Sequence, residues 1–194
     1  MRDSAVPWIK TIDPPEATGL LKEAYDWQAE RLGEPTEFTM LGSLYPEIVM
    51  ERLRLYRAVE GCPSALAQSE RQLAAYVASM MNGTGHCASG LRVKLPTLGV
   101  DEATIDAVTR DAAHVVTGDD RLDTILRYAG RLAQQPIAVE EGDLDALREV
   151  GLDDLDIVDL NNIVAYYCYI NRVANGLGLL TEIPAEHALS ALPK

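Results

Sequence analysis

The sequence predicts an all-α fold, and three observations support this prediction. Apolar residues recur at helical spacing in nearly every segment of the chain. No segment longer than a few residues alternates between apolar and polar side chains, as a half-buried strand would. Two segments, 69–81 and 163–170, are apolar on almost all faces, which is typical of helices inside a bundle. We therefore expect two buried inner helices, at about 69–81 and 153–175, surrounded by amphipathic helices.

Each expected helix begins and ends at a recognisable signal. Asp13, two prolines and Glu16 predict the start of the first helix, and Gly33 predicts its end. Asn82 and Gly83 predict the end of the first inner helix. The other expected helices are 43–61, from Thr84 to just before Pro96, 101–114, 119–135, 140–150 and 153–175.

The length and composition suit a single domain. The chain has 194 residues, of which 47% are apolar and 24% are charged, so it can build a substantial core. We expect one domain over residues 1–194, with an N-terminal arm at 1–12 and a C-terminal arm at 181–194. These arms carry exposed-looking apolar residues such as Trp8 and Leu189, which suggests that they dock on a surface, for example that of another subunit.

The charge and the cysteine content exclude several classes of function. A net charge of −13 argues against a nucleic-acid partner, which would require clustered Lys and Arg. The longest apolar run, 163–170, is far shorter than the roughly 20 residues of a membrane span. The odd set of Cys62, Cys87 and Cys168 argues against a disulfide scaffold and for a reducing compartment. We therefore expect a cytoplasmic protein with no membrane partner.

Cys87 is the candidate reactive residue. It falls in the first turn of the helix that follows the turn at 82–84. Free N–H groups and the positive end of the helix dipole favour a thiolate there, and an imidazolium at His86 would favour it further. A lowered thiol pKa would make Cys87 a nucleophile near neutral pH. The alternative is that Cys87 is a small buried apolar residue.

No metal or cofactor site is expected. The histidines His86, His114 and His187 lack the spacing of metal ligands. The sequence contains no glycine-rich phosphate loop, nucleophile elbow or dinucleotide-binding motif. Arg172 lies in a buried-looking helix, which favours pairing with a carboxylate over recognition of a ligand.

Residues 69–91 resemble the core of the alkylhydroperoxidase D (AhpD) / carboxymuconolactone decarboxylase superfamily. The whole chain is similar to its branch of uncharacterised peroxidase-related proteins. The resemblance implies an AhpD-like helical bundle that forms a homo-oligomer (dimer, trimer or hexamer), and an antioxidant oxidoreductase activity. Outside the core it rests on Trp8-Ile9, Ala17-Thr18-Gly19, Tyr128-Ala129 to Pro136, Asp143-Leu144 to Gly151-Leu152, Asn171-Arg172 and Gly176-Leu177-Gly178.

The active-site motif of the resembled peroxidases is degenerate in this chain. Those members carry Cys-x-x-Cys at a helix start, with a glutamate twelve residues before the first cysteine and a histidine one turn beyond the second. Here Thr84 and Cys87 occupy the cysteine positions, and Gln72 occupies the glutamate position, two residues after Glu70. Gly90 or Leu91 stands where the histidine would fall.

The resemblance assigns attack on peroxide to Cys87 and resolution of the sulfenate to the position of Thr84, which has no thiol. Helix-end roles offer another explanation for these residues. Thr84 suits an N-cap, and Ser69 with Gln72 suits a capping box.

Three functions remain open from the sequence. The first is a single-cysteine thiol peroxidase, in which His86 supports the Cys87 thiolate and an external thiol reduces it after reaction with an organic hydroperoxide. The second is a non-redox acid–base enzyme of the carboxymuconolactone decarboxylase type, in which His86 and Glu70 act on a small organic acid or lactone. The third is a catalytically inactive oligomeric binding protein. The sequence leaves open whether Cys62 or Cys168 can resolve Cys87.

Overall fold

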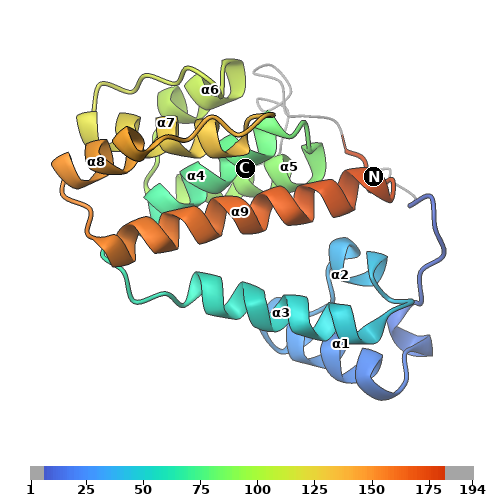
Figure 1. Ribbon diagram of the computed structural model, residues 1–194. Coiled ribbons are helices and arrows are strands. Elements are labelled where there is room, and N and C mark those ends of the chain that lie inside the picture. Colours follow the sequence, from blue (N-terminus) through green and yellow to red (C-terminus); the bar gives the residue numbers. More distant parts are fainter. Residues whose placement is uncertain (1–6, 182–194) are drawn as a thin grey trace. The chain divides into compact units, whose positions relative to one another are not determined.

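The computed structural model describes residues 7–181, and this part of the chain is helical without any strand (Figure 1). The expected all-α fold is thereby confirmed. No helix in the described ranges is both long enough and apolar enough to cross a membrane. The elements are η1 (Pro14–Glu16), α1 (Gly19–Leu32), α2 (Glu37–Leu41), α3 (Pro46–Glu60), α4 (Gln68–Met81), α5 (Gly85–Lys94), η2 (Leu95–Leu98), α6 (Glu102–Arg110), α7 (Asp120–Ala133), α8 (Glu141–Glu149) and α9 (Asp154–Gly176).

The described chain divides into two compact units. The first contains the residues up to Gly61 together with Val173–Leu180, and the second contains Cys62–Arg172. Helix α9 therefore contributes most of its length to the second unit and its last turn to the first. The expectation of a single domain over 1–194 stays a prediction.

In the first unit, α1 packs against α3 through a small apolar core of Ala24, Val49, Met50 and Leu53. The predicted helix at 43–61 starts later, at Pro46. Proline favours the first helical position, because the N–H that it lacks would have no partner inside the helix there. The predicted first helix is likewise divided into the short η1 and α1.

The described part of the N-terminal arm docks on its own unit. The Trp8 N–H donates to the Leu177 carbonyl at 3.0 Å. The Ile12 N–H donates to Ser43 Oγ, and the Tyr25 hydroxyl donates to the Ile12 carbonyl, each at 2.8 Å. These contacts need no second subunit. The predicted C-terminal arm lies outside the described residues beyond Thr181.

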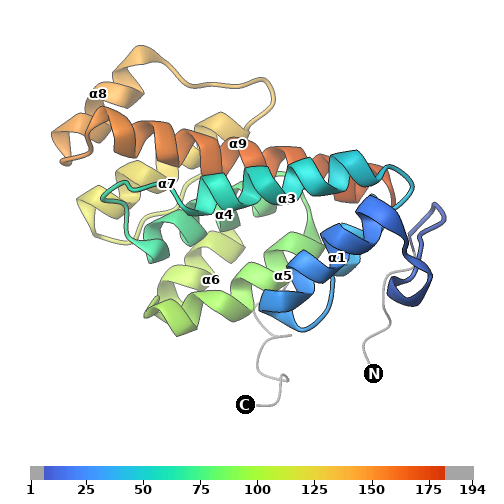
Figure 2. The same ribbon diagram turned by 90° about the horizontal axis from the view of Figure 1, so that it is seen from below.

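In the second unit, α4 is the central helix, as the sequence predicted. Every residue from Arg71 to Ser79 is buried. Helix α4 packs against α5, α6 and α7 (Figure 2). It begins at Gln68, one residue earlier than expected.

Helix α9 lies along α4 and is linked to it at both ends. Near its start, Asp159 pairs with Arg71 at 2.5 Å. Near its end, the Asn171 amide contacts Ser79 Oγ at 3.4 Å. Helix α9 buries most of its apolar residues, but one stripe, which includes Ala165 and Tyr169, stays exposed.

Candidate functional site

The turn between α4 and α5 positions the candidate residues. Asn82 ends α4, and its side-chain amide donates to the Ala78 carbonyl at 2.6 Å. Gly83 has φ of 62°, a left-handed conformation that glycine adopts without strain. The chain then enters α5 at Gly85, so Cys87 lies in the first turn of that helix, as the sequence predicted.

Burial dominates the chemistry of the Cys87 thiol. The residue is only partly exposed, and burial raises its pKa from 9.0 to about 12. A lowered pKa was expected from the helix N-terminus. The structure gives the opposite direction because burial removes the thiolate from water. The Cys87 thiol is therefore almost entirely protonated at pH 7.

Thr84 stands where the sequence resemblance places the first cysteine of the motif. It stands at the N-cap of α5 and is fully buried, but its side chain does not cap the helix. The hydroxyl donates backwards to the Asn82 carbonyl at 3.4 Å instead. The predicted N-cap position is therefore confirmed, and the predicted capping hydrogen bond is wrong.

Glu70 has a helix-end role that the sequence assigned to other residues. Because α4 begins at Gln68, the N3 position is Glu70, and its Oε2 accepts from the Ala67 N–H at 2.8 Å. The predicted capping box of Ser69 and Gln72 is therefore wrong, because the helix start lies two residues earlier, with Ala67 at the N-cap and Glu70 at N3. Gln72 is fully buried in α4.

An arginine of α7 also holds the Glu70 carboxylate. Arg121 Nε lies 2.7 Å from Glu70 Oε1, and the hydrogen bond to this carboxylate raises the pKa of Arg121. Both oxygens of Glu70 are thus in use, and the observed contacts give it a structural role.

The two other cysteines lie at opposite ends of α4, and only one of them is close to this turn. Cys168 of α9 lies beside it, since the Asn82 amide Nδ2 is 3.4 Å from Cys168 Sγ. Cys62 precedes the opposite end of α4, where its carbonyl accepts from Arg71 Nη2 at 2.7 Å. Burial, followed by the charge of Asp159, raises the pKa of Cys62. Of the two cysteines, Cys168 is the one placed next to the turn that carries Cys87.

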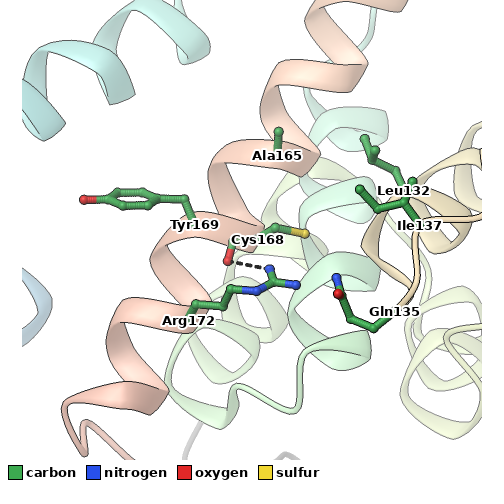
Figure 3. Close-up of a pocket in the computed structure, with 7 residues that line it drawn as sticks. All are labelled: Leu132, Gln135, Ile137, Ala165, Cys168, Tyr169 and Arg172. Carbon is green, nitrogen blue, oxygen red and sulfur yellow. Dashed lines mark hydrogen bonds between the residues drawn. The ribbon is translucent and has the colours of Figure 1, made fainter.

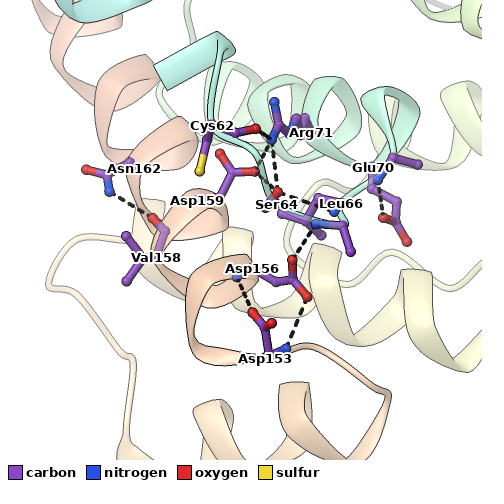
Figure 4. Close-up of polar contacts among 12 residues, drawn as sticks. Cys62, Ser64, Leu66, Glu70, Arg71, Asp153, Asp156, Val158, Asp159 and Asn162 are labelled. Atoms are coloured by element: carbon purple, nitrogen blue, oxygen red, sulfur yellow. Dashed lines mark hydrogen bonds and ion pairs between the residues drawn. The ribbon is translucent and has the colours of Figure 1, made fainter. Parts of the chain in front are cut away.

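A buried polar cluster at the start of α4 was not predicted (Figure 4). Asp159 Oδ2 accepts from Arg71 Nη2 and from Ser64 Oγ, each at 2.5 Å. Asp156 Oδ1 accepts from the Ala65 N–H at 2.7 Å. This cluster fixes the segment between α3 and α4 against α9. The available signal was Arg71 inside an otherwise apolar helix, because a buried charge requires a partner.

Within residues 7–181, no group of three or more His, Cys, Asp or Glu side chains is arranged to hold a metal ion. His86 is half-buried beside Cys87 in the first turn of α5. The turn therefore offers one half-buried thiol and one imidazole for chemistry, with a buried threonine hydroxyl nearby.

Comparisons with known proteins identify the fold. By sequence, neither a protein-family model nor a curated protein matches the chain. By structure, an uncharacterised peroxidase-related protein from Ralstonia eutropha JMP134 with an alkylhydroperoxidase AhpD core matches with a TM-score of 0.79. It is 20% identical, and the match covers 97% of this chain and 98% of the other.

Two further structures are similar. An uncharacterised peroxidase-related protein from Silicibacter sp. TM1040 has a TM-score of 0.73 at 22% identity, over 96% of this chain and 95% of its own. The debrominase Bmp8, as a cysteine-to-alanine variant in complex with 2,3,4-tribromopyrrole, has a TM-score of 0.76 at 14% identity, over 97% and 98%. These likenesses show that the chain has the AhpD-like fold.

Proposed function

We propose that this AhpD-like chain is a peroxidase-related protein with a degenerate active site, in which Cys87 alone carries the thiol chemistry. The observation that supports this most is the position of Cys87. It lies in the first turn of α5 in a fold shared with peroxidase-related proteins. The buried Thr84 stands where the sequence resemblance places the first cysteine.

The reaction needs only one protein thiol and an external one. The Cys87 thiolate attacks the terminal oxygen of an organic hydroperoxide, so that an S–O bond forms and the O–O bond breaks. The alkoxide takes a proton and leaves as an alcohol, and Cys87 becomes a sulfenic acid. A small external thiol then displaces water to give a mixed disulfide, and a second external thiol restores Cys87 and leaves as a disulfide.

The raised pKa sets the pH dependence of this activity. The thiolate is the nucleophile, and the folded pKa of about 12 lies above the working range. The thiolate fraction therefore rises about tenfold for each pH unit up to that value. We expect slow peroxide reduction at pH 7 that accelerates by about tenfold per unit as the pH increases.

The test is the pH dependence of Cys87 alkylation in the folded, reduced protein, followed by peptide mass spectrometry between pH 7 and 10. A parallel sample receives cumene hydroperoxide, and dimedone traps any sulfenate. The expected result is alkylation that increases with pH and a dimedone adduct on Cys87, both absent in Cys87→Ser. If Cys87 stays unmodified until the protein is unfolded, the proposal is wrong.

A gain-of-function variant sharpens this test. Thr84→Cys places a thiol at the position of the missing resolving cysteine, one helical turn before Cys87. We expect a disulfide between the two after peroxide treatment, and faster turnover with dithiothreitol than in the parent chain. Thr97→Cys, at an exposed position in η2, is the matched control and should leave turnover unchanged.

A second candidate function is binding without redox chemistry. The raised pKa of Cys87 favours it, because a protonated thiol is a poor nucleophile. A variant of Bmp8 binds a brominated pyrrole on the same fold, which supports small ring compounds as a ligand class. Failure of Cys87 to react in the test above would favour this alternative.

The remaining expectations have less support or stay predictions. The acid–base alternative has less support because Ala67 and Arg121 already engage both oxygens of Glu70. The expected homo-oligomer remains a prediction, which light scattering tests against the 21.2 kDa mass of one chain.

A further inference from the structure

A pocket on the second unit has one polar end and one apolar side (Figure 3). It has a volume of about 290 Å³ and lies between α9 and the end of α7 with the segment that follows it. Leu132 and Ile137 form the apolar side, while Arg172 and Gln135 point toward one another at the polar end. The turn that carries Cys87 contributes no residue to its lining, and the ligand proposed below does not depend on the reactivity of Cys87.

The wall that carries Gln135 and Ile137 is held in place before any ligand arrives. Arg131 Nε donates to the Ala138 carbonyl at 2.8 Å, and the Ala138 N–H donates to the Arg131 carbonyl at 3.1 Å. These contacts fix both ends of the short segment. Small-molecule sites are usually preformed in this way, because ordering a loop on binding costs affinity.

Arg172 has no carboxylate partner among residues 7–181. Within this range its guanidinium donates only from Nη1 to the Cys168 carbonyl of its own helix, at 3.0 Å. The sequence favoured a structural ion pair for this residue, and within the described ranges no such pair forms. Other arginines, Arg71, Arg121 and Arg148, pair with carboxylates, whereas the guanidinium of Arg172 keeps N–H donors for a ligand.

The pocket chemistry defines the ligand. A guanidinium with unused N–H donors recognises a planar carboxylate through two parallel hydrogen bonds. The Gln135 amide can donate to the same group. Ile137 is 62% exposed and offers an uncovered apolar surface beside it. The volume lies at the small end of ligand pockets, so the apolar body is about one ring in size.

We propose that this pocket binds a small organic carboxylate with a single apolar ring, whose carboxylate pairs with Arg172 and Gln135 and whose ring packs on Leu132 and Ile137. The bound ring also covers the Cys168 thiol, which lines the same pocket.

The experiment is a titration of the ¹⁵N-labelled full-length protein with benzoate, followed by NMR, with benzamide as the uncharged probe of the same shape. We expect benzoate to bind with a Kd of about 1 mM and to shift amides in 132–138 and 165–172. Benzamide should bind at least about tenfold more weakly, since it lacks the charge that Arg172 recognises.

Two variants locate the site. Arg172→Ala should raise the benzoate Kd by at least about tenfold, whereas Arg54→Ala, an exposed and paired arginine of α3, should leave it unchanged. Ala165→Phe fills the pocket from an exposed position and should abolish the shifts. Absence of saturable binding up to about 10 mM would overturn the proposal. A benzoate Kd in either Arg172→Ala or Ala165→Phe that equals that of the parent protein would also overturn it. So would amide shifts that fall outside 132–138 and 165–172.

Discussion

Near the end of the described chain, the indole ring of Trp8 packs against the backbone of Gly178. Gly178 has φ of 79°, and a Cβ atom at this position would overlap the indole ring of Trp8. The Trp8 N–H donates to the carbonyl of the preceding Leu177 at 3.0 Å. The backbone conformation and the space around it therefore both require glycine.

Gly178→Ala is expected to lower the free energy of unfolding by about 2 kcal/mol, from the left-handed strain together with the clash against Trp8. Urea denaturation measures the change. Gly142→Ala in α8, where a Cβ meets nothing within 4 Å, is the matched control and should be neutral or slightly stabilising.

The contribution of Trp8 is isolated by the double variant. In a Trp8→Ala background the clash disappears, so Gly178→Ala should cost only the backbone strain of about 1 kcal/mol. An unchanged cost in this background would show that the indole ring plays no part.

At the scale of the elements, polar links decide how α9 lies along α4. Apolar surface alone is non-directional and does not select one register between two helices. The Asp159–Arg71 pair at one end, and the contacts of Asn171 and Cys168 at the other, are directional. Asp159 is only 1% exposed at its side chain, so this pair is cut off from solvent.

Asp159→Asn is expected to destabilise the protein by about 3 kcal/mol, because it leaves the buried Arg71 charge without its carboxylate. Glu51→Gln, which breaks an exposed pair with Arg54, should change stability by less than about 1 kcal/mol. Thermal unfolding of both variants provides the comparison, and equal losses would contradict the buried role of Asp159.

Asp159→Asn should also change the rate at which Cys62 is alkylated. The charge of Asp159 is one cause of the raised pKa of this thiol, after burial. Asp159→Asn should therefore lower the pKa of Cys62 and speed its alkylation at a given pH. A merely structural loosening would speed the alkylation of Cys168 as well.

At the scale of the whole molecule, α9 joins the two compact units. The residues of α9 up to Arg172 belong to the second unit, and Val173–Leu180 belong to the first. Leu177, whose carbonyl accepts from the Trp8 N–H, directly follows α9, so the helix leads from the second unit into the first.

We therefore expect a single unfolding transition in calorimetry, with equal calorimetric and van't Hoff enthalpies, as for one domain. Gly178→Ala should shift this whole transition to lower temperature. Two transitions, of which the variant moves only one, would instead show that the units unfold independently.

Much of the fold was predictable because helical periodicity is a local property. The central position of α4 follows from its apolar faces, and the place of Cys87 in α5 follows from Asn82 and Gly83. Helix starts were less predictable. Ala67, which cannot accept a side-chain hydrogen bond, precedes α4, and Glu70 provides the compensating contact from inside the helix.

The helical class, the central helix and the turn that carries Cys87 are encoded locally, because spacing and glycine conformation act over a few neighbouring residues. The chemistry of the side chains depends instead on the folded chain. The pKa of Cys87, the partner of Glu70 and the exposure of Arg172 depend on residues distant in sequence. Burial and charge pairing are set by such neighbours, and no local pattern encodes them.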